Sequence, residues 1–397
     1  MEDNTYYTDI LQIGSLLNHA GIPYEFTGAS ALLLQGVILE DEDKITVSVQ
    51  WDLLQQAYSL FETFQPSQLV KTPEKAEFHL KINHIEAVIS FFYNTTVKTD
   101  PYRIAIPHGG EEIWCRSLYS HLYDKEMNRF SSSIHAHLLK QQQGFTEHNE
   151  QAWNQNNYLA LINRYGRPED MAEKIRQNPA WRLHPFYKYL GELNGKKVAH
   201  LMGSNGVKAA ALALLGAEVT VADFSKENKA FAEELAASCG VDINYIVSDV
   251  LSLPQAELGG KYDLVLMELG VLHYVIDLQP LAEVIGGLLK KGGRFVLHEF
   301  HPISTKLISS SGKKHKVTGN YFDPEIENNR VAFTKHMPEQ EQESLSNVVQ
   351  RKWSMGELIT AIGQSGLVIK VLEEEPNHKI HDIGLPKTYT LVCEKTY

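Results

Sequence analysis

The sequence predicts two folded domains, the second a doubly wound α/β domain and the first a smaller α+β domain. The length of 397 residues exceeds a single core, at about 150 residues per domain. From residue 196 onward, short apolar runs alternate with helical periodicity, which is typical of βαβ units. A polar stretch at 140–151, nearly free of aliphatic side chains, precedes this pattern. We therefore place the domains at 1–140 and 196–397, with a linker and helical lid at 141–195.

Composition and charge narrow the class of protein. With 43% hydrophobic and 22% charged residues the chain is globular, and no window approaches 18 consecutive apolar residues. The acidic N-terminus differs from the basic start of a signal peptide, so we expect a soluble, cytoplasmic protein that does not bind membranes. The net charge of −12 argues against nucleic acid as a partner, because phosphate binding needs clustered lysine and arginine. Cys115, Cys239 and Cys393 form no CxxC pair, which indicates a reducing compartment and argues against structural zinc.

The pattern after residue 196 resolves into seven strands with helices between them. Helices are indicated where apolar residues recur at i, i+3 and i+4, over 207–215, 226–239 and 278–289. The last of these is followed by two lysines and a Gly-Gly pair, which is typical of a helix C-terminus. The strands are the short apolar runs at 197–202, 218–222, 243–247, 262–267, 294–299, 367–372 and 389–394.

Three strand ends of this domain carry residues suited to a nucleotide-like ligand. The first strand runs into Met-Gly-Ser-Asn-Gly at 202–206, where small residues let the backbone and helix N-terminal amides approach a ligand. The second strand ends in Asp223, whose carboxylate can accept both hydroxyls of a ribose. The third is followed by Asp249, placed to meet an adenine amino group. Parallel strands bring their carboxyl ends to one edge of a sheet, so we expect one ligand site there.

Two further segments match a known family. Residues 262–274 (Tyr-Asp-Leu-Val-Leu-Met-Glu-Leu-Gly-Val-Leu-His-Tyr) look like the fourth-strand segment of class I S-adenosylmethionine-dependent methyltransferases, and 288–295 look like that family's Gly-Gly turn before strand five. The chain resembles this family over about 150–397, which implies a Rossmann-like seven-stranded methyltransferase domain and S-adenosyl-L-methionine as cofactor. The cofactor site that the resemblance implies consists of Gly203, Ser204, Asn205, Gly206, Asp223, Phe224, Asp249, Val250, Glu268 and Leu269.

The chain departs from the family at the first strand. Many members carry an acidic residue followed by Gly-x-Gly-x-Gly, whereas this chain has His200 and then Met202, and only Gly206 stands in the family's register. The cofactor carries no phosphate, so a Ser-Asn loop that hydrogen-bonds its amino-acid end is chemically adequate. We expect His200 to be a buried strand histidine bonded to backbone.

Methyl transfer needs the acceptor held in line with the sulfonium methyl, and it needs a base only where the acceptor arrives protonated. The candidate side chains follow strands four and five, at Glu268, His273, Tyr274, His298, Glu299 and His301. Of these we predict His301, His273 and Glu268 as the catalytic groups, with His301 facing the substrate. We predict no metal site, because the spacing of His298 and His301 fixes no third ligand.

Two segments outside the strand pattern are candidates for covering the site. The insertion between Pro302 and about Trp353 contains a basic cluster at 313–316, which either holds an anionic acceptor or is a solvated loop tip. Ahead of the α/β domain, aromatic and basic side chains suggest either a helical lid over the cofactor or a structural core. They are Trp153, Tyr158, Tyr165, Trp181, Arg182, His184 and Tyr187.

The first domain resembles the nucleotidyltransferase fold. A helix at 7–20, a Gly-Ala-Ser turn at 28–30 and a strand at 45–49 follow that family's order. The two alternating positions that carry metal-binding carboxylates in that family are Lys44 and Thr46 here, while the acidic residues 41–43 crowd into the preceding loop. Two-metal phosphoryl transfer requires those carboxylates, so we expect a domain without catalysis that serves binding, assembly or substrate specificity.

Together these features predict a methyltransferase that acts on a small molecule. An RNA or protein methyltransferase recruiting its substrate through the basic cluster is one alternative, and a non-enzymatic module that senses the cofactor is another. We leave open the identity of the acceptor and the atom that is methylated, because acceptor pockets in this fold are built from variable insertions. Whether the chain forms a homodimer also stays open.

Overall fold

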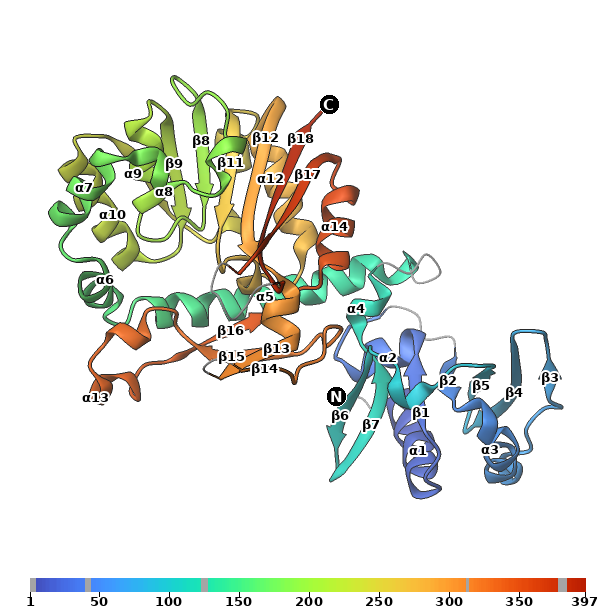
Figure 1. Ribbon diagram of the computed structural model, residues 1–397. Helices are drawn as coiled ribbons and strands as arrows, with labels where there is room; N and C mark the ends of the chain where they lie inside the picture. The colour runs from blue at the N-terminus through green and yellow to red at the C-terminus, as the bar shows by residue number, and fades with distance from the viewer. Residues whose placement is uncertain (1–4, 40–43, 123–127, 312–313, 378–383) are drawn as a thin grey trace. The chain divides into compact units, whose positions relative to one another are not determined.

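A computed structural model describes residues 5–39, 44–122, 128–311, 314–377 and 384–397 (Figure 1). The chain divides into two units. The first comprises residues 1–140 with 322–324, and the second comprises 141–321 with 325–397. No helix within these described ranges is long and apolar enough to cross a membrane.

The first unit is built on a mixed sheet in the order β3-β4-β5-β2-β1-β7-β6. Its strands are β1 (Tyr24–Thr27), β2 (Ile45–Val49), β3 (Val70–Lys71), β4 (Lys75–Ile82), β5 (Ile85–Phe92), β6 (Arg103–His108) and β7 (Glu111–Arg116). Its short helices are α2 (Gly28–Leu34), α3 (Leu54–Leu60) and α4 (Leu118–His121). Alternate residues of the strands pack with helix α1 (Thr5–His19) into one apolar core, and the expected helix and the strand at 45–49 are confirmed.

The turn that resembles nucleotidyltransferases is held by internal hydrogen bonds. The hydroxyl of Ser30 is buried, accepts from the backbone N–H of Thr46 at 3.1 Å and lies 3.1 Å from the hydroxyl of Tyr6. The hydroxyl of Thr46 donates to the carbonyl of Thr27 at 2.6 Å. The acidic residues 41–43 lie outside the described residues, and the resemblance of this unit to nucleotidyltransferases stays a prediction.

The second unit contains the predicted seven-stranded sheet, in the order β10-β9-β8-β11-β12-β18-β17. The strands are β8 (Lys197–Leu201), β9 (Glu218–Asp223), β10 (Ile243–Val247), β11 (Tyr262–Glu268), β12 (Leu289–Phe300), β17 (Leu367–Pro376) and β18 (Pro386–Lys395). Strand β18 is antiparallel to both of its neighbours, so the sheet is mixed. The order reverses beside β8, and the crevice at such a switch point is where open α/β sheets bind ligands.

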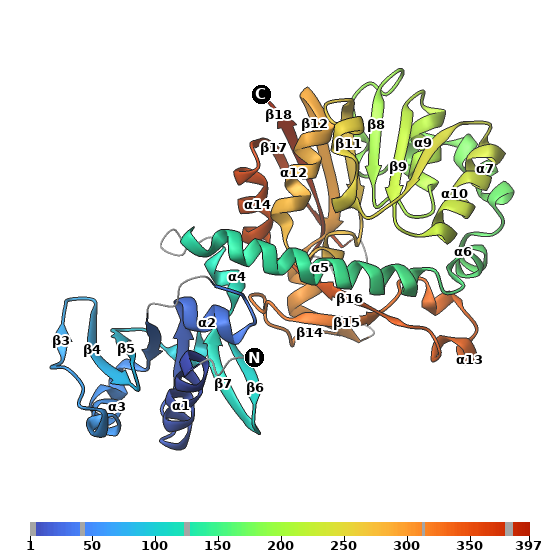
Figure 2. The same ribbon diagram turned by 180° about the vertical axis from the view of Figure 1, so that it is seen from behind.

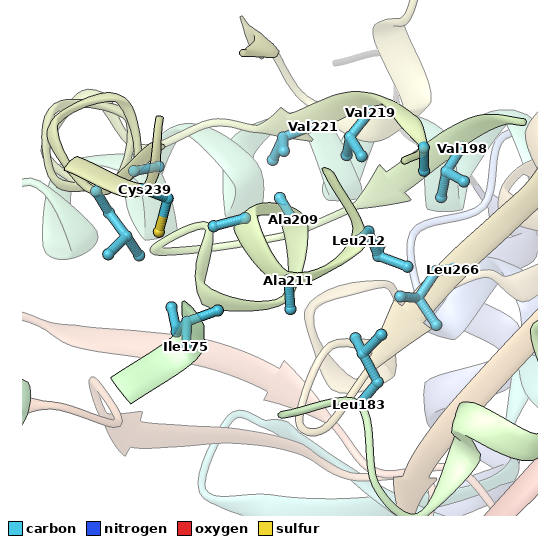
Figure 3. Close-up of a cluster of buried hydrophobic side chains, with 14 of the residues drawn as sticks. Ile175, Leu183, Val198, Ala209, Ala211, Leu212, Val219, Val221, Cys239 and Leu266 are labelled. Atoms are coloured by element: carbon cyan, nitrogen blue, oxygen red, sulfur yellow. The ribbon is translucent and has the colours of Figure 1, made fainter. Parts of the chain in front are cut away.

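Helices cover both faces of this sheet (Figures 1 and 2). On one side lie α7 (Pro168–Gln177), α9 (Val207–Leu214) and α10 (Lys226–Cys239), and on the other lie α12 (Leu278–Leu288) and α14 (Met355–Gln364). Figure 3 shows how the small residues of α9 make this packing possible, with side chains of α7 and of strands β8, β9 and β11 gathered around the helix. Those labelled are Ile175, Leu183, Val198, Ala209, Ala211, Leu212, Val219, Val221, Cys239 and Leu266.

The polar stretch expected as a linker is part of a long helix, α5 (Ser131–Trp153), and the division between the two units falls within this helix, at residues 140 and 141. The amide of Gln142 donates to the carbonyl of Tyr274 at 2.9 Å and accepts from the N–H of Ile276 at 2.7 Å. The amide of Asn149 makes the same pair of bonds with the backbone of Val349, at 2.9 and 2.7 Å. The side chains are polar because they hydrogen-bond backbone groups of neighbouring segments, so low aliphatic content did not mean an unstructured linker.

The insertion after β12 forms two small hairpins. The first pairs β13 (Ile308–Ser311) with β14 (Lys314–Val317), and the second pairs β15 (Ile326–Arg330) with β16 (Asn347–Arg351). In both views β15 and β16 lie along α5, on the side away from the sheet (Figures 1 and 2). Of the basic cluster, residue 313 lies outside the described residues, and the neighbouring Lys314 and Lys316 are exposed on β14.

Candidate functional site

A cavity of about 830 Å³ lies in the second unit, at the carboxyl ends of β8, β9, β10 and β11. Its walls come from the loops that follow these strands and from α5, α8 (Pro179–Arg182) and the β15–β16 hairpin. The expected cofactor residues that line it are Gly203, Ser204, Asn205, Asp223, Phe224, Asp249, Val250, Glu268 and Leu269. Gly206 alone of the expected set does not line it.

The loop after β8 has an alternating left-handed backbone. Met202, Ser204 and Gly206 have φ angles of 51°, 48° and 71°, which glycine adopts more easily than other residues. These are the three positions at which the resembled family has Gly-x-Gly-x-Gly, so the backbone keeps the family's register while two positions carry side chains. Gly203 is required for a different reason, since a Cβ there would come within 2.8 Å of both His200 Nδ1 and Val221 Cγ1.

Asp223 is held rigidly at the end of β9. Its Oδ2 accepts from the N–H of Ser204 at 3.1 Å, and its Oδ1 accepts from the N–H of Ser225 at 2.9 Å and from Asn228 Nδ2 at 3.2 Å. Burial raises the pKa of this carboxyl, and the three N–H donors oppose that shift. A fixed carboxylate that borders the cavity can accept hydroxyl donors of a ligand.

Asp249 caps the short turn after β10, where its Oδ1 accepts from the N–H of Leu251 at 3.1 Å. Burial raises its pKa, and hydrogen bonds from Leu251 and from Thr146 of α5 oppose the shift. Thr146 belongs to a stripe of α5 that lines the cavity together with Gln142, Asn149 and Trp153. Gln142, Thr146 and Asn149 were missed as site residues, and Trp153 was expected only as part of a lid or a structural core, although the spacing of i, i+4, i+7 and i+11 places all four on one helix face.

At the end of β11, Glu268 forms an ion pair with Lys208 of α9, with 3.6 Å between Oε2 and Nζ. The ammonium of Lys208 also donates to the carbonyl of Arg182, and all three residues line the cavity. Burial raises the pKa of Glu268, and the charge of Lys208 opposes that shift. Lys208 was not predicted as a site residue, and Arg182 was expected only as part of the lid.

His273 borders the cavity and belongs to the loop that follows β11. Burial lowers its pKa, so the imidazole is neutral at pH 7 and its unprotonated nitrogen can accept a proton. In the described part of the chain, no residue forms a hydrogen bond to its ring, and the ring of Tyr274 lies 5.1 Å away between centroids. A neutral imidazole facing a cavity fits the role of a general base.

Glu299, another catalytic candidate from the sequence, forms hydrogen bonds with the backbone of the loop after β11. Its carboxylate accepts from the backbone N–H groups of Gly270, Val271 and Phe300 at 2.6, 2.9 and 2.7 Å. The side chain is 4% exposed and does not line the cavity. The structure therefore gives Glu299 a positioning contact with the loop that carries His273.

His301 does not face the cavity, contrary to the sequence-based expectation. It is 3% exposed, its Nε2 lies 2.7 Å from Glu374 Oε1, and its Nδ1 accepts from the N–H of Ile303 at 3.1 Å. The backbone N–H of His301 continues the pairing of β12 with β18 by donating to Lys387, and the side chain reaches β17 on that side of the sheet. Both ring nitrogens are thus engaged away from the cavity.

The two other strand histidines are also buried. His298 has its Nδ1 3.0 Å from Thr390 Oγ1, and burial lowers its pKa to about 4. His200 is 1% exposed, and burial lowers its pKa to about 3. The expectation that His200 bonds to backbone is wrong, because neither of its ring nitrogens has a hydrogen-bond partner within the described segments. Among those segments no cluster of three or more His, Cys, Asp or Glu side chains is placed to hold a metal ion.

Comparison with known proteins identifies the central part of this unit. Residues 202–297 match a family described as a methyltransferase domain. The ubiquinone biosynthesis O-methyltransferase of Bordetella pertussis is 28% identical over 136 residues, which cover 34% of this chain and 56% of that protein. The protein of the same name from Azotobacter vinelandii is 34% identical over 137 residues, covering 34% and 58%. The chain thus spans little more than half the length of these relatives.

Among solved structures, an S-adenosylmethionine-dependent methyltransferase from Mesorhizobium loti is 22% identical, with a TM-score of 0.43 over 56% of this chain and 99% of that one. Magnesium protoporphyrin IX methyltransferase from Synechocystis with bound S-adenosylhomocysteine is 16% identical, with a TM-score of 0.39 over 62% and 97%. The family of residues 202–297 is given by the match to the methyltransferase domain. The matched residues include the strand ends that carry Asp223, Asp249 and Glu268. Residues 202–297 therefore form a methyltransferase domain.

Proposed function

We propose that this chain transfers a methyl group from S-adenosylmethionine to a hydroxyl group of a small molecule. The observation that carries the proposal is the convergence of Asp223, Asp249 and Glu268, from three different strand ends, on one cavity. A hydroxyl acceptor is favoured because the curated relatives are named O-methyltransferases. A small acceptor is favoured because the exposed lysines of β14 do not line the cavity.

The cavity fits the cofactor in size and in chemistry. Ligand pockets range from about 300 to 1,000 Å³, so 830 Å³ leaves room for a cofactor and a small acceptor together. Asp223 would accept the ribose hydroxyls, and Asp249 would accept the adenine amino group. Gly203, Ser204 and Asn205 of the loop after β8 line the cavity, where they would contact the cofactor. When bound, the cofactor supplies a methyl group on a positively charged sulfur that is already a good leaving group.

The residues of the chain would act mainly by orientation and by removing one proton. His273 would take the proton of the acceptor hydroxyl, because its ring is neutral at pH 7 and borders the cavity. Glu299 would keep the His273 loop in place through its bonds to backbone N–H groups. We propose Glu268 as a cofactor contact rather than as a base, because it is already paired with Lys208.

The acceptor would enter where the cavity wall is exposed and apolar. Trp181, Leu269 and Phe300 line the cavity and remain 64%, 40% and 38% exposed. Such exposed aromatic and aliphatic side chains at a cavity mouth suit a planar, partly apolar acceptor such as a phenol. Arg330 of the β15–β16 hairpin lines the same cavity and adds a positive charge.

We further propose that the first unit has no catalytic role and serves binding or assembly. We propose the cytoplasm as the location of the whole chain. The support is the engagement of Ser30 and Thr46 in internal hydrogen bonds, which leaves neither hydroxyl directed at a nucleotide. The division at residues 140 and 141 is consistent with a unit that folds around its own core.

Methyl transfer from S-[methyl-³H]adenosylmethionine to a panel of phenols and catechols tests the proposed function. We expect label in a phenolic acceptor with the wild-type chain and a loss of about 10²- to 10⁴-fold in kcat for His273→Gln, the usual contribution of a general base. Lys188→Gln, which alters an exposed lysine outside the cavity, is the matched control. Label in RNA or protein with none in any small molecule would contradict the proposal.

A further inference from the structure

The turn that carries His273 depends on side chains from outside it. It is a single 3₁₀ turn, Leu272–Tyr274, and one turn of this kind is too short to be stable alone. At its start, the carboxylate of Glu299 accepts from the backbone N–H of Leu272 at 3.3 Å. The carbonyl groups of the turn need donors as well, and the orientation of the His273 ring depends on what holds them.

Trp353 is a donor to the carbonyl groups on both sides of His273 and Tyr274. Its indole Nε1 donates to the carbonyl of Leu272 at 3.1 Å and to that of Val275 at 3.0 Å. Trp353 follows β16, is buried and does not line the cavity. It therefore holds the turn without contacting a ligand in the cavity.

The indole of Trp353 is itself fixed by buried charged groups. Arg351 is fully buried, and the central carbon of its guanidinium lies 3.7 Å from the centre of the indole ring. The same guanidinium forms an ion pair with Glu357, at 2.6 Å between Nη2 and Oε1. The other oxygen of Glu357 accepts from the N–H and the hydroxyl of Ser354 at 2.9 and 2.8 Å, at the start of α14. A donor held by such a network keeps its acceptors in one place.

We propose that Trp353 is a positioning residue for methyl transfer, which sets the orientation of His273 through the backbone of its turn. This inference rests on the proposed function, in which His273 takes the proton of the acceptor hydroxyl. Glu299 holds the turn by a backbone N–H and Trp353 holds it by two carbonyl groups. Trp353 thus acts on the base from outside the cavity.

Two variants that remove the indole N–H test this inference. The first is Trp353→Phe, and the second is Trp353→3-benzothienylalanine, in which sulfur replaces the N–H with nearly the same ring shape. In both we expect kcat for methyl transfer to a phenol to fall by about 5- to 50-fold, because slight misplacement of a catalytic group can cost about 10²-fold. The affinity for S-adenosylhomocysteine should stay within about twofold of wild type, because Trp353 does not line the cavity.

The pH dependence of kcat separates a positioning role from a general structural one. Burial lowers the pKa of His273, so the wild type keeps a neutral base below the ordinary histidine value of about 6.5. A loosened turn admits water to the ring and raises this pKa, so the acid-side fall of kcat should begin at a higher pH in both variants. The charged groups that act on the ring, Glu299, Glu327 and Lys352, are the same in wild type and variants.

Trp114→Phe is the matched control. The ring of Trp114, in the first unit, also has an arginine beside it, with the central guanidinium carbon of Arg103 3.7 Å from the ring centre. Its indole N–H bonds to no residue within the described ranges, and Trp114 does not line the cavity. We therefore expect the kcat and the pH profile of the wild type. Thermal unfolding of each variant checks that both units are folded.

Three results would overturn the inference. One is a kcat within about twofold of wild type in both folded variants. Another is a loss of S-adenosylhomocysteine affinity as large as the loss of kcat, which would indicate a general structural role. The third is a lower kcat with an unchanged pH profile. Full activity of His273→Gln, or no methyl transfer by the folded wild type, would instead refute the proposed function, and the inference would fail with it.

Discussion

Gly206 is the residue of the loop after β8 whose replacement has the most predictable cost. Its φ angle is 71°, and an added Cβ would lie 2.5 Å from the Cβ of Ala232 and 3.1 Å from its Cα. In Gly206→Ala the left-handed backbone costs about 1–2 kcal/mol. Crowding between α9 and α10 costs a further 1–3 kcal/mol or so, the usual range for overpacking. We therefore expect the free energy of unfolding to fall by about 2–5 kcal/mol.

Gly240→Ala is the matched control for this prediction. Gly240 has a φ angle of 72°, and no atom lies within 4 Å of the place where a Cβ would stand. Only the backbone contribution of about 1–2 kcal/mol should appear there. Differential scanning calorimetry separates the transition of the second unit, which is identified by its shift when S-adenosylhomocysteine is added. If Gly206→Ala and Gly240→Ala lowered the free energy of unfolding equally, the packing of α9 against α10 would not be the reason that position 206 needs glycine.

Three further predictions concern other sites. Burial raises the pKa of Glu25 to about 7. Between about pH 4.5 and 7 the folded chain therefore keeps a proton on Glu25 that the unfolded chain has released. Denaturant titrations should therefore show that wild type loses about 2–3 kcal/mol between pH 5 and 8 relative to Glu25→Gln, and parallel pH profiles would contradict this. Ser204→Gly should raise the free energy of unfolding by up to about 1 kcal/mol in the same titrations, because the left-handed φ of 48° is relieved while the N–H to Asp223 is kept; a destabilised variant would refute it. His301→Ala should lower the melting temperature and keep kcat within about threefold, since general-base losses begin near 10²; a kcat loss as large as that of His273→Gln would show that His301 acts in catalysis.

Most of the α/β domain could be predicted because its elements are long and strongly periodic. The bounds of α10 and β10 coincide with the predicted 226–239 and 243–247, and the seven strands are all present. The strand direction was predicted less well. The antiparallel pairing of β18 depends on tertiary contacts with β12 and β17 that periodicity does not report.

The site was predictable where it depends on strand ends and not where it depends on contacts between distant segments. Asp223 and Asp249 follow strands of one parallel sheet, so their proximity follows from topology. Thr146 comes from a helix whose position over the sheet has no sequence signal, and Arg182 was expected only as part of a lid or a structural core. His301 was misplaced because the side of β12 to which it turns is set by pairing with β18 and by Glu374 on β17.

Calorimetric titration of S-adenosylhomocysteine into the wild-type chain and into Asp223→Asn tests the central claim most directly. The claim is that the cavity at the ends of β8 to β11 binds the cofactor. We predict one binding site per chain in the wild type and an affinity at least tenfold lower in the variant, because a carboxylate hydrogen bond to a ribose hydroxyl is worth about 1.5–3 kcal/mol. No binding at millimolar ligand, or equal binding by wild type and Asp223→Asn, would contradict the claim.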